Sequence, residues 1–290
     1  MISVDVLIPT MNRLQSLIMT LSGVALQSRT DLGVIVADQS DEPATRSEVV
    51  RSLCKLIEAR GNRVCWYHRK ERCGIAEQRD FLLRVSSADA VLYLDDDVIM
   101  ESWVVEKMAN VLEEQGCAFV GAFPTQPTYI DDVRPHQQHI EYWVSRVRPE
   151  IVNPGDPEWH RATLHTAANL FHVAQGLGLP PGDVRLYKVS WIGACVMYDR
   201  RKLLEIGGFS FWRRLPRKLV GEDALVQNIL MRLWGGCGIV PSGTYFAEVP
   251  SNFPDQYRSR DHHALMLLPE MIKTHAPHTP MPKPDAWKYW

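Results

Sequence analysis

The alternation of apolar strands and amphipathic helices in the first half of the chain constrains its fold most strongly. Short apolar runs at residues 4–8, 32–37, 64–67, 90–94 and 118–123 predict buried strands, and the stretches between them have the apolar spacing of helices. Unbroken alternation of this kind is typical of a parallel sheet with helices on both faces. We therefore predict an α/β fold with a Rossmann-like, mostly parallel central sheet.

Three consecutive carboxylates, Asp95, Asp96 and Asp97, follow the apolar run at 90–94. Like charges so close together repel and cannot be buried unpaired, so folding alone gives no reason for them. Carboxylate oxygens suit Mg²⁺ or Mn²⁺, which in turn hold phosphate groups, and open α/β sheets bind ligands at the carboxyl ends of their strands. The pattern indicates a divalent-cation site for a phosphate-bearing ligand, with a solvated acidic turn as the alternative.

Two further acidic points occur at a strand end and at a helix start. Asp38 closes the second strand, and Glu222 with Asp223 opens a helix. A carboxylate at a strand tip can accept hydrogen bonds from a nucleobase or a ribose, and a carboxylate across the cleft can take a proton from an attacking hydroxyl. Together with a cation held against a diphosphate, these points predict transfer of a group activated by a nucleoside diphosphate.

Composition and motifs exclude several classes of protein. The 290 residues include 32 Lys and Arg against 34 Asp and Glu, which is not the basic balance of a general nucleic-acid binder. The six cysteines form no CxxC pair, and neither a GxGxxG motif after the first strand nor a P-loop motif occurs. No apolar run is long enough to span a membrane, and the first strand begins at Val4 without room for a signal peptide. We expect a cytoplasmic protein without a transmembrane segment.

The second half of the chain is less regular. Residues 124–188 are rich in Pro, His and Trp, and only one helix is expected there, over 158–175. The sheet pattern returns as a strand at 189–198. The final segment, 251–290, forms an extension with a helix at 261–275 and a proline-rich, extended tail. Aromatic residues at the end of such a tail dock on the same chain or on a partner subunit, so a homo-oligomer formed through the tail is one expectation.

Seven short segments carry a resemblance to a known family, and they follow one another in the family's order along residues 4–249. Their sequences are VLIPTMNR (6–13), VIVADQS (34–40), GIAEQRD (74–80), LYLDDD (92–97), WIGAC (191–195), GGF (207–209) and ED (222–223). The set resembles glycosyltransferase family 2 enzymes of the GT-A fold, with the DXD motif at the fourth segment. This resemblance implies an inverting, metal-dependent transfer from a nucleotide sugar, and family habit favours UDP over GDP or dTDP.

The resemblance also implies an organisation of the chain. Residues 1–250 would form one GT-A domain, followed by the extension at 251–290. Within the domain, residues 1–124 would bind the nucleotide sugar and residues 125–250 would bind the acceptor.

The same resemblance implies a role for each matching residue. The donor nucleotide would be bound by Pro9, Thr10, Asp38, Arg79, Asp95 and Asp96. Asp97 and Asp95 would bind the cation, Mn²⁺ or Mg²⁺. Asp223 would be the general base, and Glu222 would orient the acceptor or the base. The acceptor would be bordered by Trp191, Gly193 and Ala194.

Two positions depart from the family's motifs. Asp80 stands where the family usually has Asn. A His metal ligand commonly follows the helix that begins at the Glu-Asp pair, but this chain has Glu248 in that region. The third metal ligand is therefore open between Glu248, His262 and His263.

A basic and aromatic segment precedes the predicted base. Residues 209–218 contain four cations and three aromatic side chains. A solvated basic loop is one interpretation. The other is a loop that binds an anionic acceptor, namely a lipid phosphate, an acidic saccharide or a nucleic acid with modified bases. The acceptor-binding candidates in this segment are Trp212, Arg213, Arg214, Arg217 and Lys218.

Two other functions fit parts of the pattern. Asp95 and Asp97 after an apolar strand also resemble the nucleophile strand of haloacid-dehalogenase-like phosphatases, but there the motif lies on the first strand, whereas here three strands precede it. A non-catalytic protein that binds nucleotide sugars or polyanions is the second alternative. Asp223 argues against that alternative, because binding alone needs no positioned base.

Overall fold

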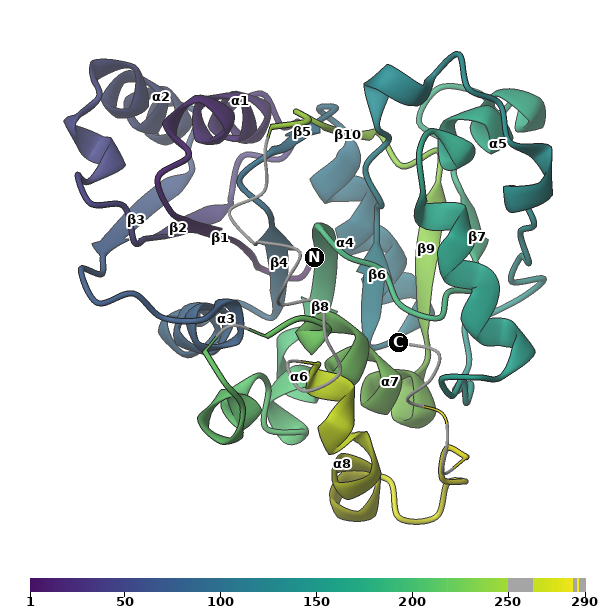
Figure 1. Cartoon of the computed structure of the whole chain (residues 1–290). Helices are drawn as coiled ribbons and strands as arrows, with labels where there is room; N and C mark the ends of the chain where they lie inside the picture. Colours follow the sequence, from purple (N-terminus) through teal and green to yellow (C-terminus); the bar gives the residue numbers. More distant parts are fainter. Residues whose placement is uncertain (218, 250–262, 284–285, 287–290) are drawn as a thin grey trace.

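The central element of the fold is an eight-stranded sheet of order β3-β2-β1-β4-β8-β6-β9-β7 (Figure 1). The computed structural model describes residues 1–217, 219–249, 263–283 and 286. The strands of the sheet are β1 (Val4–Thr10), β2 (Gly33–Asp38), β3 (Arg63–His68), β4 (Ala90–Leu94), β6 (Phe119–Gly121), β7 (Arg185–Tyr187), β8 (Cys195–Asp199) and β9 (Gly236–Val240). A separate antiparallel pair is formed by β5 (Val98–Met100) and β10 (Thr244–Phe246).

The predicted α/β class, with mostly parallel strands, is confirmed. Strands β3, β2, β1 and β4 are parallel, as are β6 and β9. Strand β8 runs antiparallel to both β4 and β6, and β7 runs antiparallel to β9. The carboxyl ends of β1, β2 and β4 therefore lie at the same edge of the sheet as the beginning of β8.

Helices cover both faces of the sheet (Figure 1). One face carries α1 (Leu14–Ala25), α2 (Glu48–Ala59) and α4 (Val104–Gln115). The other face carries α3 (Ile75–Val85), α5 (Asn169–Leu177), α6 (Arg200–Glu205) and α7 (Glu222–Trp234). Short 3₁₀ segments are η1 (Ala44–Arg46), η2 (Pro127–Tyr129), η3 (Pro135–Gln137), η4 (Pro157–His165) and η5 (Ser210–Arg214).

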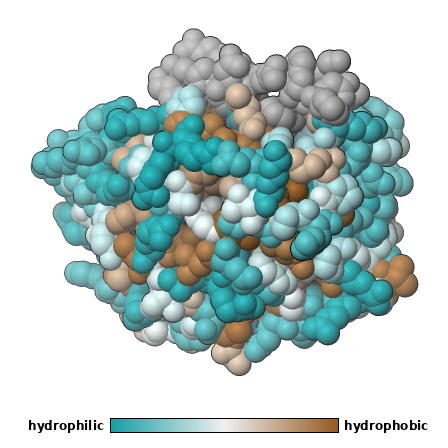
Figure 2. Space-filling model, turned by 90° about the horizontal axis from the view of Figure 1, so that it is seen from below, coloured by the Kyte–Doolittle hydropathy of each residue, from teal (hydrophilic) through white to brown (hydrophobic). Residues whose placement is uncertain are grey.

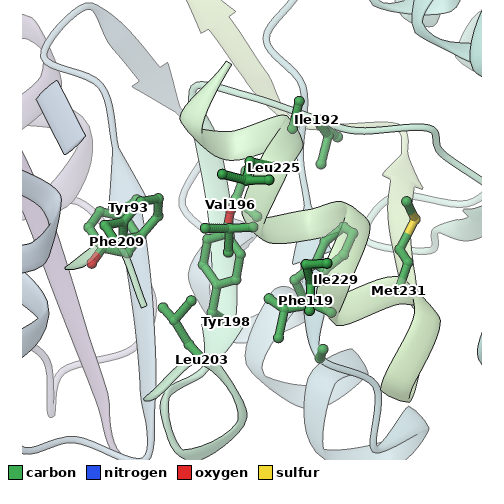
Figure 3. Packing of buried hydrophobic residues seen from close by; sticks show 14 of the residues in the cluster. Tyr93, Phe119, Ile192, Val196, Tyr198, Leu203, Phe209, Leu225, Ile229 and Met231 are labelled. Carbon is green, nitrogen blue, oxygen red and sulfur yellow. The ribbon is translucent and has the colours of Figure 1, made fainter. Parts of the chain in front are cut away.

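Strand β4 is buried on both of its faces. Leu92 and Leu94 belong to the core against α1 and α4, whereas Tyr93 belongs to the core against α3 and α7. Figure 3 shows this second core, in which Tyr93 and Phe209 lie together with ring centroids 5.3 Å apart. Full burial of one such side chain contributes roughly 1.5–3 kcal/mol. A strand with apolar residues on both faces is thus the middle layer of the fold, as its continuous apolar run indicates.

Two expected elements differ in the structure. The helix predicted over 158–175 is split into η4 and α5, because Ala167 between them has a left-handed φ of 51° that interrupts helical geometry. The strand predicted over 189–198 begins only at Cys195, and the residues before it are irregular, with a φ of 65° at Ala194. Neither left-handed residue is a glycine, so the local sequence did not predict that the helix and the strand would be interrupted there.

The C-terminal extension packs on α7. The helix expected from residue 261 consists of η8 (Ala264–Leu267) and α8 (Leu268–His275), and its first two residues lie outside the described range. Leu268 and Ile272 join the core that contains α7. On the face of the molecule that carries α8, hydrophobic residues form patches between hydrophilic ones (Figure 2). No helix within the described ranges is long and apolar enough to cross a membrane.

The start of the proline-rich tail is tied to the same helix. Arg232 of α7 donates hydrogen bonds to Thr279 Oγ1 at 3.1 Å and to the Pro280 carbonyl at 2.7 Å. This part of the tail therefore docks on its own chain. The aromatic end at 287–290, on which the expected homo-oligomer depends, lies outside the described residues.

Candidate active site

The acidic tip of β4 is held by an arginine from each face of the sheet. Asp95, Asp96 and Asp97 lie in the turn between β4 and β5, beside the ends of β1 and β2 (Figure 1). The turn directs Asp95 toward Arg79 of α3, whereas Asp96 and Asp97 both contact Arg13 in front of α1.

Arg79 joins carboxylates from two distant parts of the chain. Its Nη1 donates to Asp223 Oδ1 and lies 3.6 Å from Glu222 Oε1, and its Nη2 lies 3.3 Å from Asp95 Oδ1. The side chain is only 5% exposed, and the guanidinium lies 5.6 Å from the centre of the Tyr93 ring. Burial opposes the charge, but Glu222 and Asp95 nevertheless raise the pKa of Arg79. The structure thus brings together four residues that the sequence singled out separately.

Arg13 makes the second set of ion pairs. Its Nη1 donates to Asp96 Oδ1 at 2.7 Å and its Nη2 to Asp97 Oδ2 at 2.6 Å. The other Asp96 oxygen accepts a hydrogen bond from the Thr10 hydroxyl at 2.6 Å, and Asp96 is 4% exposed. Sequence analysis assigned no role to Arg13. Charge balance was the available signal, because the ends of parallel neighbours meet and three carboxylates need cations nearby.

Burial raises the pKa of two carboxyls at the tip. It raises the pKa of Asp95 to about 7, with Asp97 adding to the shift and Arg79 opposing it. It raises the pKa of Asp96 to about 6, against the effects of Thr10 and Arg13. The Asp95 side chain keeps an exposure of 36%. It can therefore meet a ligand from solvent, while Asp96 cannot.

The predicted nucleoside slot lies at the ends of β1 and β2, where Pro9 and Thr10 face Ala37 and Asp38 in register. Asp38 is fully buried. Its carboxylate accepts hydrogen bonds at 2.7 to 3.3 Å from three donors of the chain, namely Ser40 N, Ala44 N and Trp66 Nε1. In this conformation Asp38 shapes the loop that follows β2.

A buried glutamine of α7 shapes the predicted acceptor wall. Gln227 Nε2 donates to the Ile192 carbonyl at 2.7 Å, and its Oε1 accepts from the Ile192 N–H at 2.8 Å. A Cβ placed on Gly193 would lie 3.7 Å from the Trp191 ring and 4.0 Å from Asp223 Oδ2. The second oxygen of Asp223 therefore faces this wall. Sequence analysis missed Gln227, although a polar residue four positions after Asp223 shares its helix face.

The three candidates for a further metal ligand are placed differently. Glu248 accepts hydrogen bonds from the Thr128 hydroxyl at 2.6 Å and from the Thr128 N–H at 3.1 Å. His263 lies against Gly221, where an added Cβ would be 2.1 Å from the imidazole. His262 lies outside the described residues. In the part of the chain that the structure describes, no three His, Cys, Asp or Glu side chains are placed to hold one ion together.

The basic segment before α7 packs between α3 and α8. The Trp212 indole donates to Asp80 Oδ2 at 3.2 Å. Arg214 pairs with both oxygens of Glu270 in α8, with Nη1 at 2.6 Å from Oε1. The other cations of the segment are the exposed Arg213 and Arg217, together with Lys218, which lies outside the described residues.

Comparison with known proteins gives a family and a fold. A family model described as Glycosyl transferase family 2 matches residues 5–178. No curated protein sequence matches the chain. The solved structure of residues 1–349 of S. aureus TarS in complex with UDP-GlcNAc aligns with a TM-score of 0.56 and 14% identity, over 87% of this chain and 60% of that one.

A second solved structure has a similar fold. The mannosyltransferase PcManGT from Pyrobaculum calidifontis, in complex with GDP-Man and Mn²⁺, aligns with a TM-score of 0.53 and 14% identity, over 98% of this chain and 66% of that one. A longer TarS structure aligns over 85% of this chain but only 37% of its own length, with a TM-score of 0.53 and 15% identity. At these identities the likeness is one of fold.

Proposed function

The chain belongs to glycosyl transferase family 2, and from this membership we propose that it transfers a sugar from a nucleoside-diphosphate sugar to a hydroxyl acceptor. The observation that carries the proposal is the position of Arg79, which joins Asp95 at the strand edge to Asp223 at the start of α7. Structures of similar fold contain UDP-GlcNAc and GDP-Man. Our preferred donor is a UDP-sugar, bound beside Pro9, Thr10 and Asp38.

We assign donor binding and acceptor binding to consecutive parts of the chain. Residues 1–124 bind the donor, residues 125–250 bind the acceptor, and 251–290 form an extension of this one domain. Arg79 connects the two halves, because its partners Asp95 and Asp223 belong to different ones.

The oxygens at the strand edge fit a hard divalent cation. Mg²⁺ is commonly held by one or two carboxylates and completed by substrate phosphates and water, so a cage of three protein ligands is not required. Asp97 Oδ1 and Asp95 Oδ2 take part in no hydrogen bond within the described residues. These two oxygens are the proposed ligands of Mn²⁺ or Mg²⁺. When bound, the cation neutralises negative charge on the leaving diphosphate.

Asp223 is the proposed general base of an inverting transfer. Arg79 holds its Oδ1, while its Oδ2, which faces Gly193, is the oxygen proposed to accept the hydroxyl proton. The acceptor oxygen bonds to the anomeric carbon from the side opposite the diphosphate, the bond from that carbon to the diphosphate breaks, and the hydroxyl proton passes to Oδ2. Glu222, 3.6 Å from Arg79, is proposed to orient the base through that arginine.

The proposed acceptor site lies along the wall that Gln227 supports. Trp191 is proposed to offer an aromatic face beside Gly193 and Ala194, and the basic segment before α7 is proposed to supply positive charge at the rim of this site. A negatively charged acceptor would be drawn to such a rim. A lipid phosphate, an acidic saccharide and a nucleic acid with modified bases share this chemistry.

A panel of nucleotide sugars, with and without Mn²⁺, tests the proposal. A ligand that binds only the native state raises the melting temperature. We expect a UDP-sugar with Mn²⁺ to raise Tm and to be hydrolysed slowly to UDP, and Asp97→Ala to lose both effects. A protein that binds none of the nucleotide sugars contradicts the proposal. Phosphate release from simple phosphomonoesters would instead indicate a phosphatase, and binding without hydrolysis or transfer would indicate a non-catalytic protein.

A further inference from the structure

Arg13 already neutralises Asp97, the carboxylate that is proposed to bind the cation through its other oxygen. Its guanidinium spans Asp96 and Asp97, with N–O distances of 2.7 and 2.6 Å, and the Arg13 side chain is 16% exposed. A guanidinium keeps its charge at any physiological pH. This ion pair is therefore opened by a competing ligand and not by titration of Arg13.

The turn before α1 fixes the position from which Arg13 reaches the tip. Asn12 has a left-handed φ of 54°, and its N–H donates to Ser40 Oγ at 2.8 Å. Its side chain exchanges two hydrogen bonds of 2.9 Å with Asp41. The backbone next to Arg13 is thus tied to the loop after β2.

The two carboxylates hold Arg13 unequally. Asp96 uses both oxygens, one on Arg13 and one on Thr10. Asp97 uses only Oδ2 among the described contacts, and that oxygen is bound to Arg13 Nη2. If Asp97 were taken by another cation, Nη1 could stay on Asp96 while Nη2 changed its partner. A short swing of the guanidinium is sufficient.

We propose that Arg13 is an internal counter-ion that competes with the divalent cation for Asp97 and pairs with the donor's diphosphate once it is displaced. This inference rests on the proposed function, because it concerns the same cation and the same donor. Guanidinium N–H groups match phosphate oxygens in geometry and charge. Displacement of Arg13 thus costs less when a diphosphate is present to receive it. The cation and the diphosphate therefore bind with positive coupling, each strengthening the other.

The test measures Mn²⁺ binding by titration calorimetry, first alone and then with saturating UDP. In Arg13→Gln, Mn²⁺ alone should bind about tenfold more tightly than in wild type, because a full positive charge next to Asp97 is gone. With UDP present this gain should vanish or reverse, because the diphosphate has lost its guanidinium partner. Arg13→Lys keeps the charge without the forked geometry, so it should resemble wild type with Mn²⁺ alone and lose part of the coupling with UDP.

Arg29→Gln is the matched control. The Arg29 side chain is 4% exposed and donates to both oxygens of Asp31, itself 60% exposed, at 2.5 and 2.9 Å, so it is a buried arginine in a carboxylate pair away from the acidic tip. This variant should leave both Mn²⁺ titrations unchanged. Thermal unfolding of each variant shows whether it is folded. If Arg13→Gln does not fold, the comparison of Arg13→Lys with wild type is the test.

The outcomes separate this inference from the proposed function. Equal Mn²⁺ affinities in wild type and Arg13→Gln, a weaker affinity in the variant, or no Mn²⁺ binding by either protein would overturn the role of Arg13. A wild-type protein that still hydrolyses a nucleotide sugar in that case keeps the proposed function. Failure of the wild type to bind any nucleotide sugar would remove the proposed function itself.

Discussion

At the scale of single residues, three site carboxylates each pair with an arginine through only one of their two oxygens. Asp223 and Asp95 each give one oxygen to Arg79, and Asp97 gives one to Arg13. Such pairing lets an acidic cluster fold without a ligand, while the remaining oxygens stay available for chemistry. Loss of one partner from a buried ion pair typically costs about 3–5 kcal/mol. Loss of either arginine should therefore lower the stability of the protein.

Replacement of the proposed base should separate binding from chemistry. Asp223→Asn keeps an oxygen that can accept the Arg79 hydrogen bond, but the amide cannot take a proton from the acceptor. We expect donor binding to persist and transfer to fall by about 10²- to 10⁴-fold. Steady-state transfer and UDP-sugar binding measure the two effects. Turnover within a few-fold of wild type would place the base elsewhere, with Glu222→Gln as the next variant to measure.

Cation binding should strengthen as the pH rises. The pKa of Asp95 is raised to about 7 and that of Asp96 to about 6, so both carboxyls gain charge across this range. Mn²⁺ affinity should therefore increase between about pH 5 and pH 8. Mn²⁺ titrations over the pH range check the prediction, and a flat profile contradicts it.

The same raised pKa values lower the stability of the cation-free protein as the pH rises, because the native state keeps protons that the unfolded chain releases. The contribution of these two carboxyls to stability then falls as the pH rises from 3.8, the ordinary pKa of the carboxyl, to the raised values of about 6 and 7.

At the scale of elements, α7 connects the proposed base to the acceptor wall. Asp223 lies in its first turn and Gln227 in the next, and Gln227 holds the irregular segment before β8 through Ile192. A register shift or a break in this helix would disturb both groups together. The helix thus sets the distance between the base and the surface on which an acceptor would rest.

Replacement of Gln227 should destabilise the proposed acceptor wall. Gln227→Leu leaves the Ile192 N–H and carbonyl without these partners, at about 1–3 kcal/mol for each buried group. We expect a lower Tm and impaired transfer, with hydrolysis of the donor largely retained. Gln27→Leu is the matched control, because Gln27 is also buried and bonds the Gly23 and Glu101 carbonyls far from the wall. Equal effects of both variants on transfer would argue against a positioning role for Gln227.

At the scale of the whole molecule, charge is nearly balanced, with 32 Lys and Arg against 34 Asp and Glu. Local concentrations of charge therefore decide what the surface attracts. The carboxylates gather at one edge of the sheet, and the basic segment before α7 lies between α3 and α8. In that segment Arg214 already has a partner, because Glu270 of α8 binds it. All three described arginines of the segment are exposed, but Arg213 and Arg217 form no ion pair among the described residues.

Arg213 and Arg217, which form no ion pair among the described residues, should matter more for anion binding than the paired Arg214. The double variant Arg213→Gln with Arg217→Gln should weaken binding to heparin and to anionic phospholipid vesicles and reduce its salt dependence. Arg214→Gln should affect these less and lower Tm instead, because it releases α8. A double variant of two exposed arginines elsewhere, Arg46→Gln with Arg51→Gln, controls for net charge. If donor hydrolysis falls while anion binding is unchanged, the segment covers the donor and does not meet the acceptor.

The sequence by itself determined the class of fold and the composition of the acidic edge. Hydrophobic periodicity is a local property, so the runs that became β1, β2 and β4 were visible without the tertiary structure. Their order in a parallel sheet places the residues that follow them at one edge, which is why Asp38 and Asp95 could be assigned together. Asp223 was visible as a carboxylate at a helix start, and the family motifs added Arg79 because those segments recur in a fixed order.

Only the tertiary structure decided which charges meet. Arg79 and Asp223 are 144 positions apart, and Arg13 and Asp96 are 83 apart, so no local pattern links them. Their pairing follows from strand order and from the turn after β4, which directs Asp95 to Arg79 and both Asp96 and Asp97 to Arg13. The breaks at Ala167 and before Cys195 have the same origin, because contacts from other elements outweigh the local preference for a helix or a strand. Local preferences are worth tenths of a kcal/mol per residue, whereas a buried charge pair or hydrogen-bonded wall is worth about 1–5 kcal/mol.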